Sequence, residues 1–371
     1  MLKAYKYRLY PNKEQEIQIK KTFGCTKFVY NKMLSIKIDK YKNENLSMSR
    51  IDCNNYCNRV LKKEFEWLKE VDKWSITNSI YNMDTAYKNF FKGLSNYPKF
   101  KSKKDNHKSY KTNFANNNIE VNFDDNKIKL PKLKWVKCKA HRKFNGKIKS
   151  ATISQNPSGK YFVSVLVDTE NIQLPKNNNS IGLDLGIKSL LITSDGVVYD
   201  NKKYTYKYEK QLAKLQRQLA KKKKGSNNYN KQRIKIAKLY EKIANARRDN
   251  LHKISSEIIK DNQFIFSEDL NIQGMLKNSR LSKAISDCGW YELTRQLQYK
   301  AEWNGRVYMK VNRFYPSSQL CNKCGYKNTD TKGTKGLGIR YWECPECREI
   351  HDRDINASIN VLKEGLRILE M

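Results

Sequence analysis

Two pairs of cysteines in the last sixty residues have the spacing of a metal site. Cys321 and Cys324 form one C-x2-C pair, and Cys344 and Cys347 form a second. Two such pairs, each in a short turn, can close a tetrahedral set of thiolates around one Zn²⁺ ion. Four thiolates leave no open position on the metal, so the sequence predicts a zinc ion with a structural role and no part in hydrolysis.

Three acidic residues occupy places where a carboxylate needs an explanation. Asp184 follows the apolar "IGL", and Glu268 follows "FIFS", so each lies at the end of an expected buried strand, where an unpaired carboxylate is costly unless it binds a metal. Asp354, in "HDRDINAS", lies at an expected helix start, where its ordinary role is an N-cap. Each residue alone has such a structural explanation, but together they match an RNase H-like nuclease, whose acids hold two Mg²⁺ ions across a scissile phosphate.

The charge of the chain indicates a polyanionic partner. Lysine and arginine number 74 against 37 acidic residues, which gives a formal charge of +37 spread over every segment. Such a surface repels itself unless a polyanion neutralises it, and nucleic acid is the leading candidate. A membrane surface would also attract it, but no apolar run of about 18 residues occurs and no signal peptide is recognisable. We therefore expect a cytoplasmic protein without a membrane partner.

Cysteine usage agrees with this expectation. Nine cysteines without an export signal predict thiols or thiolate ligands and no disulfides. The five that lie outside the C-x2-C pairs are predicted to be small buried hydrophobic residues. They are Cys25, Cys53, Cys57, Cys138 and Cys288.

The first half of the chain changes its hydrophobic period twice. Residues 2–10 alternate like a strand, and Asn12 with Gln15 then predicts a capped helix start. A helical region follows and closes near residue 104, and period-two segments with an antiparallel hairpin occupy about 110–170. We expect residues 2–10 to join this later β domain. A stripe at helical spacing is predicted to form the helical core: Phe28, Val29, Met33, Leu34, Ile76, Ile80, Tyr87, Phe90 and Phe91.

The second half alternates strands and helices. Two or three strands that turn at Asp195-Gly196 precede two long helical stretches, at about 204–223 and 228–260. A strand ending at Glu268, a helix from about 281 to 304, another strand, the cysteine unit and a final helix follow. The excess of lysine and arginine on the two long helices favours a phosphate-facing role over a solvated charged face.

Seven short motifs together resemble the TnpB family of transposon-encoded RNA-guided DNA nucleases, which are related to type V CRISPR effectors. The resemblance extends over nearly the whole chain, with the motifs in family order. They are "RLYPNKEQ", "FGCTKFVYN", "YPKFKSK", "GLDLGIKS", "SEDL", "YPSSQLCNKCG" and "HDRDINASIN".

The resemblance implies a multidomain α+β fold with a split RuvC nuclease domain of RNase H-like type, and Asp184, Glu268 and Asp354 as its catalytic, Mg²⁺-binding carboxylates. A zinc ribbon is inserted just before the third acid, so that its exit lies beside the metals. A wedge β-barrel with a helical recognition lobe inserted in it makes up the rest. The implied boundaries are 1–10 (wedge strand), 11–104 (recognition lobe), 105–172 (wedge barrel), 178–314 (RuvC, first two motifs), 315–349 (zinc ribbon) and 350–371 (RuvC, final motif).

The resemblance also implies partners and alternatives. A guide RNA from the transposon right end (ωRNA) would lie on the basic surfaces and direct cleavage of double-stranded DNA next to a short 5′ flanking motif. Candidate contacts to that motif are Lys73, Trp74, Thr77 and Asn116. A guided repressor that binds without cutting is disfavoured because all three acids are present. A compact type V CRISPR effector remains an alternative, and the older label of transposase is disfavoured because no histidine pair with a tyrosine nucleophile motif is seen.

Overall fold

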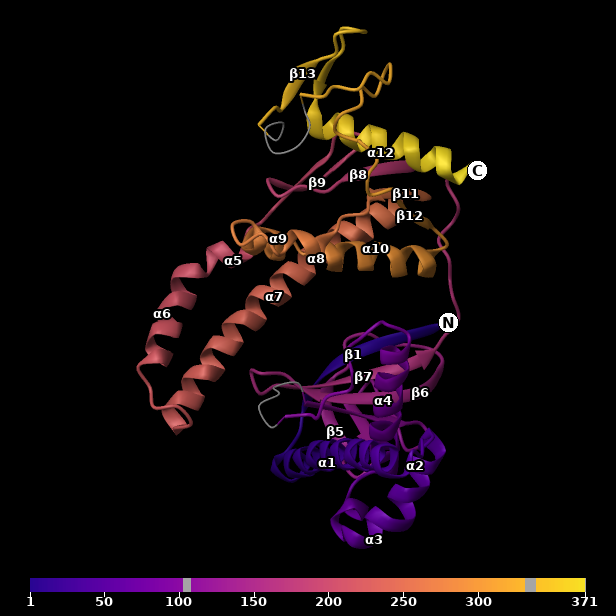
Figure 1. Cartoon of the computed structure of the whole chain (residues 1–371), viewed down its shortest axis with the longest axis vertical. Helices are drawn as coiled ribbons and strands as arrows, with labels where there is room; N and C mark the ends of the chain where they lie inside the picture. The colour runs from indigo at the N-terminus through magenta and orange to yellow at the C-terminus, as the bar shows by residue number, and fades with distance from the viewer. Residues whose placement is uncertain (103–107, 331–337, 371) are drawn as a thin grey trace. The chain divides into compact units, whose positions relative to one another are not determined.

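The computed structural model describes residues 1–102, 108–330 and 338–370, which form two compact units, residues 1–170 and 171–371 (Figure 1). Parts of the predicted segments 11–104, 105–172, 315–349 and 350–371 therefore lie outside the described residues. Among the residues that are described, no helix combines the length and the apolar character needed to cross a membrane.

The first unit is built on an antiparallel sheet of seven strands. The order of the strands is β2-β6-β7-β1-β5-β4-β3. The N-terminal strand β1 lies between β7 and β5, with Tyr7 and Leu9 fully buried, which confirms that residues 2–10 join the later strands. The bounds are β1 (Leu2–Tyr10), β2 (Lys108–Asn113), β3 (Glu120–Asn122), β4 (Lys127–Leu130), β5 (Lys134–Lys139), β6 (Lys147–Gln155) and β7 (Tyr161–Asp168).

This sheet corrects the expected wedge β-barrel. No ladder joins the edge strands β2 and β3 in the described part of the chain, so the sheet is open. A barrel requires hydrogen bonds around the whole circumference. The strands β3 and β4 have three and four residues, so this end of the sheet offers few backbone groups for a closing ladder.

Helices are inserted between β1 and β2, as the change of period predicts. The first begins with the predicted capping box, in which Gln15 N donates to Asn12 Oδ1 (2.8 Å) and Asn12 N donates to Gln15 Oε1 (3.0 Å). The elements are α1 (Lys13–Glu44), α2 (Arg50–Tyr56), a π-helical turn (Cys57–Leu61), α3 (Lys62–Glu64), a 3₁₀ turn (Glu66–Glu70) and α4 (Lys73–Phe91).

Most of the predicted stripe forms the core of these helices. Val29, Met33, Leu34, Ile76, Ile80 and Tyr87 are buried together, and Phe28 packs against them. The expectation is wrong for Phe91, whose side chain is 78% exposed, because α4 ends at this residue and extends beyond the core. All five cysteines outside the C-x2-C pairs are buried, as predicted.

The second unit contains a five-stranded sheet in the order β10-β9-β8-β11-β12, in which β8, β11 and β12 are parallel. The turn between β9 and β10 lies at Asp195-Gly196, where Gly196 has φ 86°, as predicted. The bounds are β8 (Ser180–Asp184), β9 (Ser189–Thr193), β10 (Val198–Asp200), β11 (Phe264–Glu268) and β12 (Val307–Val311).

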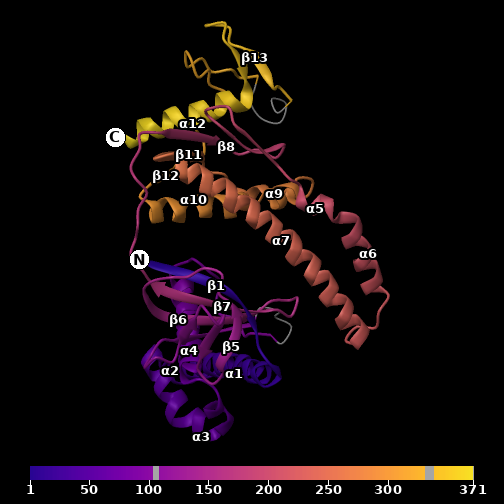
Figure 2. The same ribbon diagram turned by 180° about the vertical axis from the view of Figure 1, so that it is seen from behind.

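Helices cover both faces of this sheet (Figures 1 and 2). Ile265 of β11 packs with residues of α7 and α10, and its neighbour Phe266 packs against α12, because successive strand residues face opposite sides. Gly182 allows α12 to approach β8 closely, since a Cβ there would lie 2.1 Å from Ser358 O. The helices are α5 (Tyr204–Lys207), α6 (Glu209–Ala220), α7 (Asn227–Asp261), α8 (Ile272–Met275), α9 (Ser282–Cys288), α10 (Trp290–Asn304) and α12 (Arg353–Leu369).

Two predicted helices are divided. The stretch 204–223 consists of α5 and α6, and the stretch 281–304 consists of α9 and α10. The second break lies at Gly289, which has a left-handed φ of 70° that suits glycine and ends α9. The stretch 228–260 is a single helix, α7, as predicted.

Candidate active site and cysteine cluster

The three predicted acids lie at one edge of the second unit's sheet. Asp184 and Glu268 are the last residues of β8 and β11, which are neighbouring parallel strands, so both side chains lie at the same edge. Asp354 lies in the first turn of α12, which packs on these strands. The fold thus brings together residues that are separated by 84 and 86 positions in the sequence.

The electrostatics of Asp184 reflect this grouping. Burial raises the pKa of Asp184 well above its usual range, and the negative charges of Glu268 and Asp354 raise it further. The pKa of Glu268 is also raised by burial, against the opposing effects of a hydrogen bond from Ser317 and the charge of Arg353. Partly buried carboxylates that repel one another are stabilised by a cation, so the donor set fits a divalent metal.

Two side chains that sequence reasoning missed contact these acids. Ser317 Oγ donates a hydrogen bond to Glu268 Oε1 at 2.5 Å. Arg340 Nη1 forms an ion pair with Asp354 Oδ2 at 2.5 Å. Ser317 is 49 residues from Glu268, and no sequence period connects them.

The structure also settles which acid caps α12. Asp352 is the N-cap, because its Oδ1 accepts hydrogen bonds from Asp354 N (2.9 Å) and Ile355 N (3.1 Å). The ordinary explanation for Asp354, that it caps the helix, is therefore wrong. Its carboxylate is directed to other partners.

The four cysteines of the C-x2-C pairs form a cluster. Their Sγ atoms all lie within 4.8 Å of one another, which fits the thiolates of a single zinc ion. This is the one group of three or more candidate metal ligands at such spacing in residues 1–102, 108–330 and 338–370. The second pair lies between the short strands β13 (Tyr341–Glu343) and β14 (Ile350–Asp352).

A histidine next to the final helix supports this cluster. His351 of β14 is buried, and its Nε2 lies 3.0 Å from Cys321 Sγ. Its ring packs against Trp342, its partner across the β13–β14 pair, at 4.7 Å between centroids. His351 thus links the first cysteine pair to the strand that leads into Asp354.

Two asparagines of α12 hold the first cysteine segment to the acids. Asn356 accepts from Asn322 N (2.9 Å) and donates to Leu320 O (2.7 Å). Asn360 donates to Ser317 O (2.8 Å) and to Leu320 O (2.7 Å). The helix that carries Asp354 therefore positions the segment that carries both Ser317 and the cysteines. In the sequence, the signal for this arrangement is a pair of asparagines four residues apart, which lie on one helix face just after Asp354.

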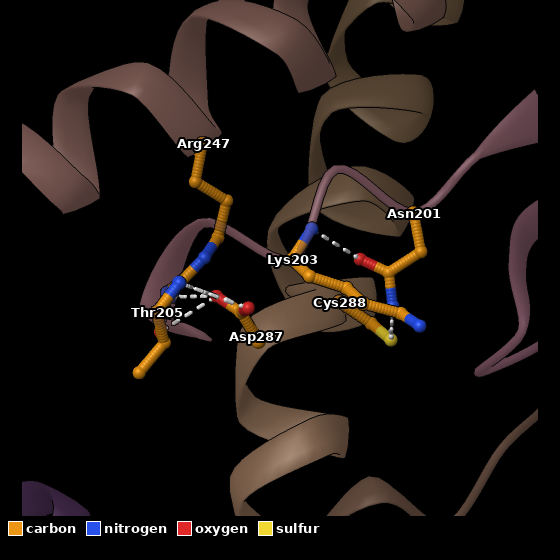
Figure 3. Close-up of polar contacts among 6 residues, drawn as sticks. All are labelled: Asn201, Lys203, Thr205, Arg247, Asp287 and Cys288. Carbon is orange, nitrogen blue, oxygen red and sulfur yellow. Dashed lines mark hydrogen bonds and ion pairs between the residues drawn. The ribbon is translucent and has the colours of Figure 1, made fainter. Parts of the chain in front are cut away.

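Within the second unit, a buried ion pair joins the basic helix α7 to α9 (Figure 3). Asp287 of α9 is buried and accepts from Arg247 of α7 at 2.6 Å. Asp287 also accepts from Thr205 of α5, from its N (3.0 Å) and its Oγ1 (2.7 Å). This buried ion pair and its additional hydrogen bonds hold α5 and α7 against α9.

The candidate contacts to a flanking motif lie in the first unit. Lys73 is exposed, Trp74 and Thr77 are partly buried in α4, and Asn116 is exposed in the turn after β2. Trp74 Nε1 is buried without a hydrogen-bond partner in the described part of the chain, and Thr77 Oγ1 lies 3.4 Å from Asn54 Oδ1. Asn78 ties α4 to β2 through Lys111 O (3.1 Å). The role of the four residues stays a prediction.

Curated relatives align with almost the whole chain. A Streptomyces pristinaespiralis protein named "Putative RNA-guided DNA endonuclease" is 34% identical over 98% of this chain and 89% of its own length. "Putative RNA-guided DNA endonuclease InsQ" of Escherichia coli is 31% identical over 99% of this chain and 93% of its own. "TnpB-like protein L79" of Acanthamoeba polyphaga mimivirus is 25% identical over 99% and 74%. The chain belongs to the TnpB family.

Family models match three segments of this TnpB-family chain. Residues 162–279 match "Probable transposase", and residues 290–361 match "Cas12f1-like, TNB domain". Residues 1–45 match "Helix-turn-helix domain", but in the structure they form the strand β1 and the single helix α1. The second match spans the cysteine cluster and Asp354 together.

Proposed function

We propose that this TnpB-family protein is the RNA-guided DNA endonuclease of an insertion-sequence transposon. The observation that carries the proposal is the meeting of Asp184, Glu268 and Asp354 at one sheet edge. Relatives named for the same activity align with nearly the whole chain, which supports RNA and DNA as partners. The formal charge of +37 supports them independently.

We assign phosphodiester hydrolysis to a RuvC-type site. Asp184, Glu268 and Asp354 would hold two Mg²⁺ ions, which supply an activated hydroxide and a charge that stabilises the leaving oxygen. Ser317 orients Glu268 through its hydrogen bond. Arg340 and Arg353 lower the repulsion among the acids, since both lower the pKa of Asp184.

The cysteine cluster would hold one structural Zn²⁺ ion through Cys321, Cys324, Cys344 and Cys347. We assign residues 315–349 to a zinc ribbon, between the RuvC segments 178–314 and 350–371. Segments 1–10 and 105–172 would form the wedge domain, as an open sheet, and 11–104 the recognition lobe. Within this arrangement Lys73, Trp74, Thr77 and Asn116 would contact the flanking motif.

Sequence choice would be made by the guide RNA. The protein can recognise a guide–target duplex through the sugar-phosphate backbone of the duplex. It would read bases directly only in a short motif beside the target. Exchanging the guide segment should therefore redirect cleavage without any change in the protein.

A plasmid library with randomised flanks tests the proposal. We expect the protein with its native RNA to cut beside one short 5′ motif, and with a re-targeted RNA to cut the new target beside the same motif. The Asp184→Ala variant with the same RNA is the matched control. Equal cutting without RNA, or cutting that ignores the new guide, would contradict the proposal, and binding without cutting by the unaltered protein would indicate a repressor.

A further inference from the structure

The end of α4 and the residues after it form an exposed apolar surface that no role above explains. Phe91 is 78% exposed, Leu94 74%, Phe100 57% and Tyr97 45%. Single exposed apolar residues are ordinary, but several close together mark an interaction site. We call Phe90, Phe91 and Tyr97, with Tyr87 beneath them, the aromatic platform.

The rings of the platform contact one another. Phe90 lies 5.3 Å from Phe91 and 5.3 Å from Tyr97, between ring centroids. Phe91 is stacked with Tyr87 at 6.4 Å with an interplanar angle of 23°. The buried Tyr87 thus supports a group of rings whose outer members are accessible.

The platform is held in place by hydrogen bonds to the helices below it. The hydroxyls of Tyr87 and Tyr97 lie 3.0 Å apart. Gly93 N donates to Phe90 O (2.9 Å), which folds the chain back at the end of α4. Farther along, Lys101 N donates to Asn31 Oδ1 of α1 (2.8 Å). Tyr97 and the chain that follows α4 are therefore held against the helices, which lowers the entropy cost of binding.

The charge around the platform indicates what binds there. Residues 85–102 contain four lysines and no acidic residue. Lys92 and Lys99 are exposed on either side of Tyr97 in the sequence. Aromatic faces combined with lysines suit a strand whose unpaired bases stack on the rings while its phosphates meet the lysines. Lys88 is paired with Asp84 (2.9 Å), so Lys92 and Lys99 are the lysines assigned to the phosphates.

We propose that the aromatic platform binds single-stranded nucleic acid, with an unpaired base stacked on Phe91 and neighbouring phosphates on Lys92 and Lys99. The inference deepens the proposed function, since it assigns a surface for an unpaired segment of RNA or DNA. The test of this inference measures binding alone, so a negative result in the cleavage experiment would not contradict it.

The test uses fluorescence anisotropy with the full chain and four probes: a 12-nucleotide uridine RNA, the DNA strand of the same sequence, an abasic strand of the same length and a blunt duplex. We expect Phe91→Ala to weaken binding of the single strands about tenfold, the size of one lost stacking contact. Phe91→Trp should restore affinity, and Phe91→Leu should not, because leucine keeps the apolar area without the ring face. The abasic strand and the duplex should be unaffected. Comparison of the RNA and DNA arms shows which strand the platform prefers.

The salt dependence of binding distinguishes the contribution of the rings from that of the lysines. Lys92→Gln should lower the slope of log K against log salt by about 0.7, the value for one phosphate contact on a single strand, whereas Phe91→Ala should leave the slope unchanged. The matched control is Tyr41→Ala, which removes a ring that is 62% exposed and lies between two lysines of α1. Unchanged binding by Phe91→Ala, an equal loss on the abasic strand, or a change in oligomeric state would overturn the proposal.

Discussion

The cysteine cluster and the acid cluster both lie in the second unit, and Asp354 follows the last cysteine by seven residues, but the two clusters are built differently. The cysteines come from two local turns and converge within 4.8 Å. The acids come from two strands and a helix, and burial together with the charges of Glu268 and Asp354 raises the pKa of Asp184. A closed thiolate site suits a permanent structural ion, whereas carboxylates that repel one another at a sheet edge suit exchangeable Mg²⁺ ions.

The largest expected effect concerns the acids alone. Asp184→Ala should lower DNA cleavage by more than about a thousandfold, because the carboxylate is required for the metal-dependent chemistry. Binding of guide and target should stay within about twofold, since we propose that basic surfaces elsewhere hold the nucleic acid. Cleavage and binding assays at matched Mg²⁺ concentration check this. Undiminished cutting by the variant would remove Asp184 from the site.

The next effect concerns the cysteines alone. The double variant Cys344→Ser, Cys347→Ser should lose the zinc that the unaltered protein is expected to carry at about one ion per chain, because two of four thiolates are removed. Metal analysis by mass spectrometry measures this. Cys138→Ser is the control, since Cys138 is buried in the hydrophobic core of the first unit and is not one of the four clustered cysteines. Full zinc content in the double variant would show that the metal is bound elsewhere.

A smaller effect tests the connection between the clusters. Ser317→Ala removes the hydrogen bond to Glu268 and should slow cleavage about tenfold, the worth of a hydrogen bond to a charged group. Zinc content should be unchanged, since Ser317 is not a metal ligand. The neighbouring Ser318→Ala variant serves as control. Equal rates for both serine variants would show that Glu268 needs no such support.

The smallest effect concerns stability and pH. Because the pKa of Asp184 is raised in the folded protein, the metal-free fold binds this proton more tightly than the unfolded chain. Its contribution to stability is therefore lost as pH rises from the ordinary aspartate value, about 3.9, through the raised folded value. Asp184→Asn should increase the Tm of the second unit of the metal-free protein at neutral pH by roughly 2–4 °C, the effect of about 1 kcal/mol on a unit of about 200 residues.

Calorimetry with and without Mg²⁺ completes this test. Mg²⁺ should raise the Tm of the unaltered protein and should raise that of Asp184→Asn less, because the ion offsets a repulsion that the variant lacks. A lower Tm for the metal-free variant at neutral pH would show that the ionised Asp184 does not destabilise the metal-free fold.

The sequence was a good guide to residues fixed by local patterns. The alternation of residues 2–10, the Asn12 capping box, the C-x2-C pairs and the three acids at element ends all depend on neighbours a few positions away. Contacts such as Ser317 with Glu268 or Arg340 with Asp354 depend on how separate elements pack, and no period encodes them. The closed barrel was an expectation from the family resemblance, and the sequence pattern could not test it, because periodicity shows which face a residue takes and not whether the last strand pairs with the first.

The most direct test of the central claim is anomalous X-ray scattering from crystals of the RNA-bound protein soaked in Mn²⁺ in place of Mg²⁺. Data collected on both sides of the zinc and manganese absorption edges distinguish the two metals. We expect a zinc peak among Cys321, Cys324, Cys344 and Cys347, and manganese peaks beside Asp184, Glu268 and Asp354. Manganese at the cysteines, or no metal beside the acids in a complex that still cuts DNA, would contradict it.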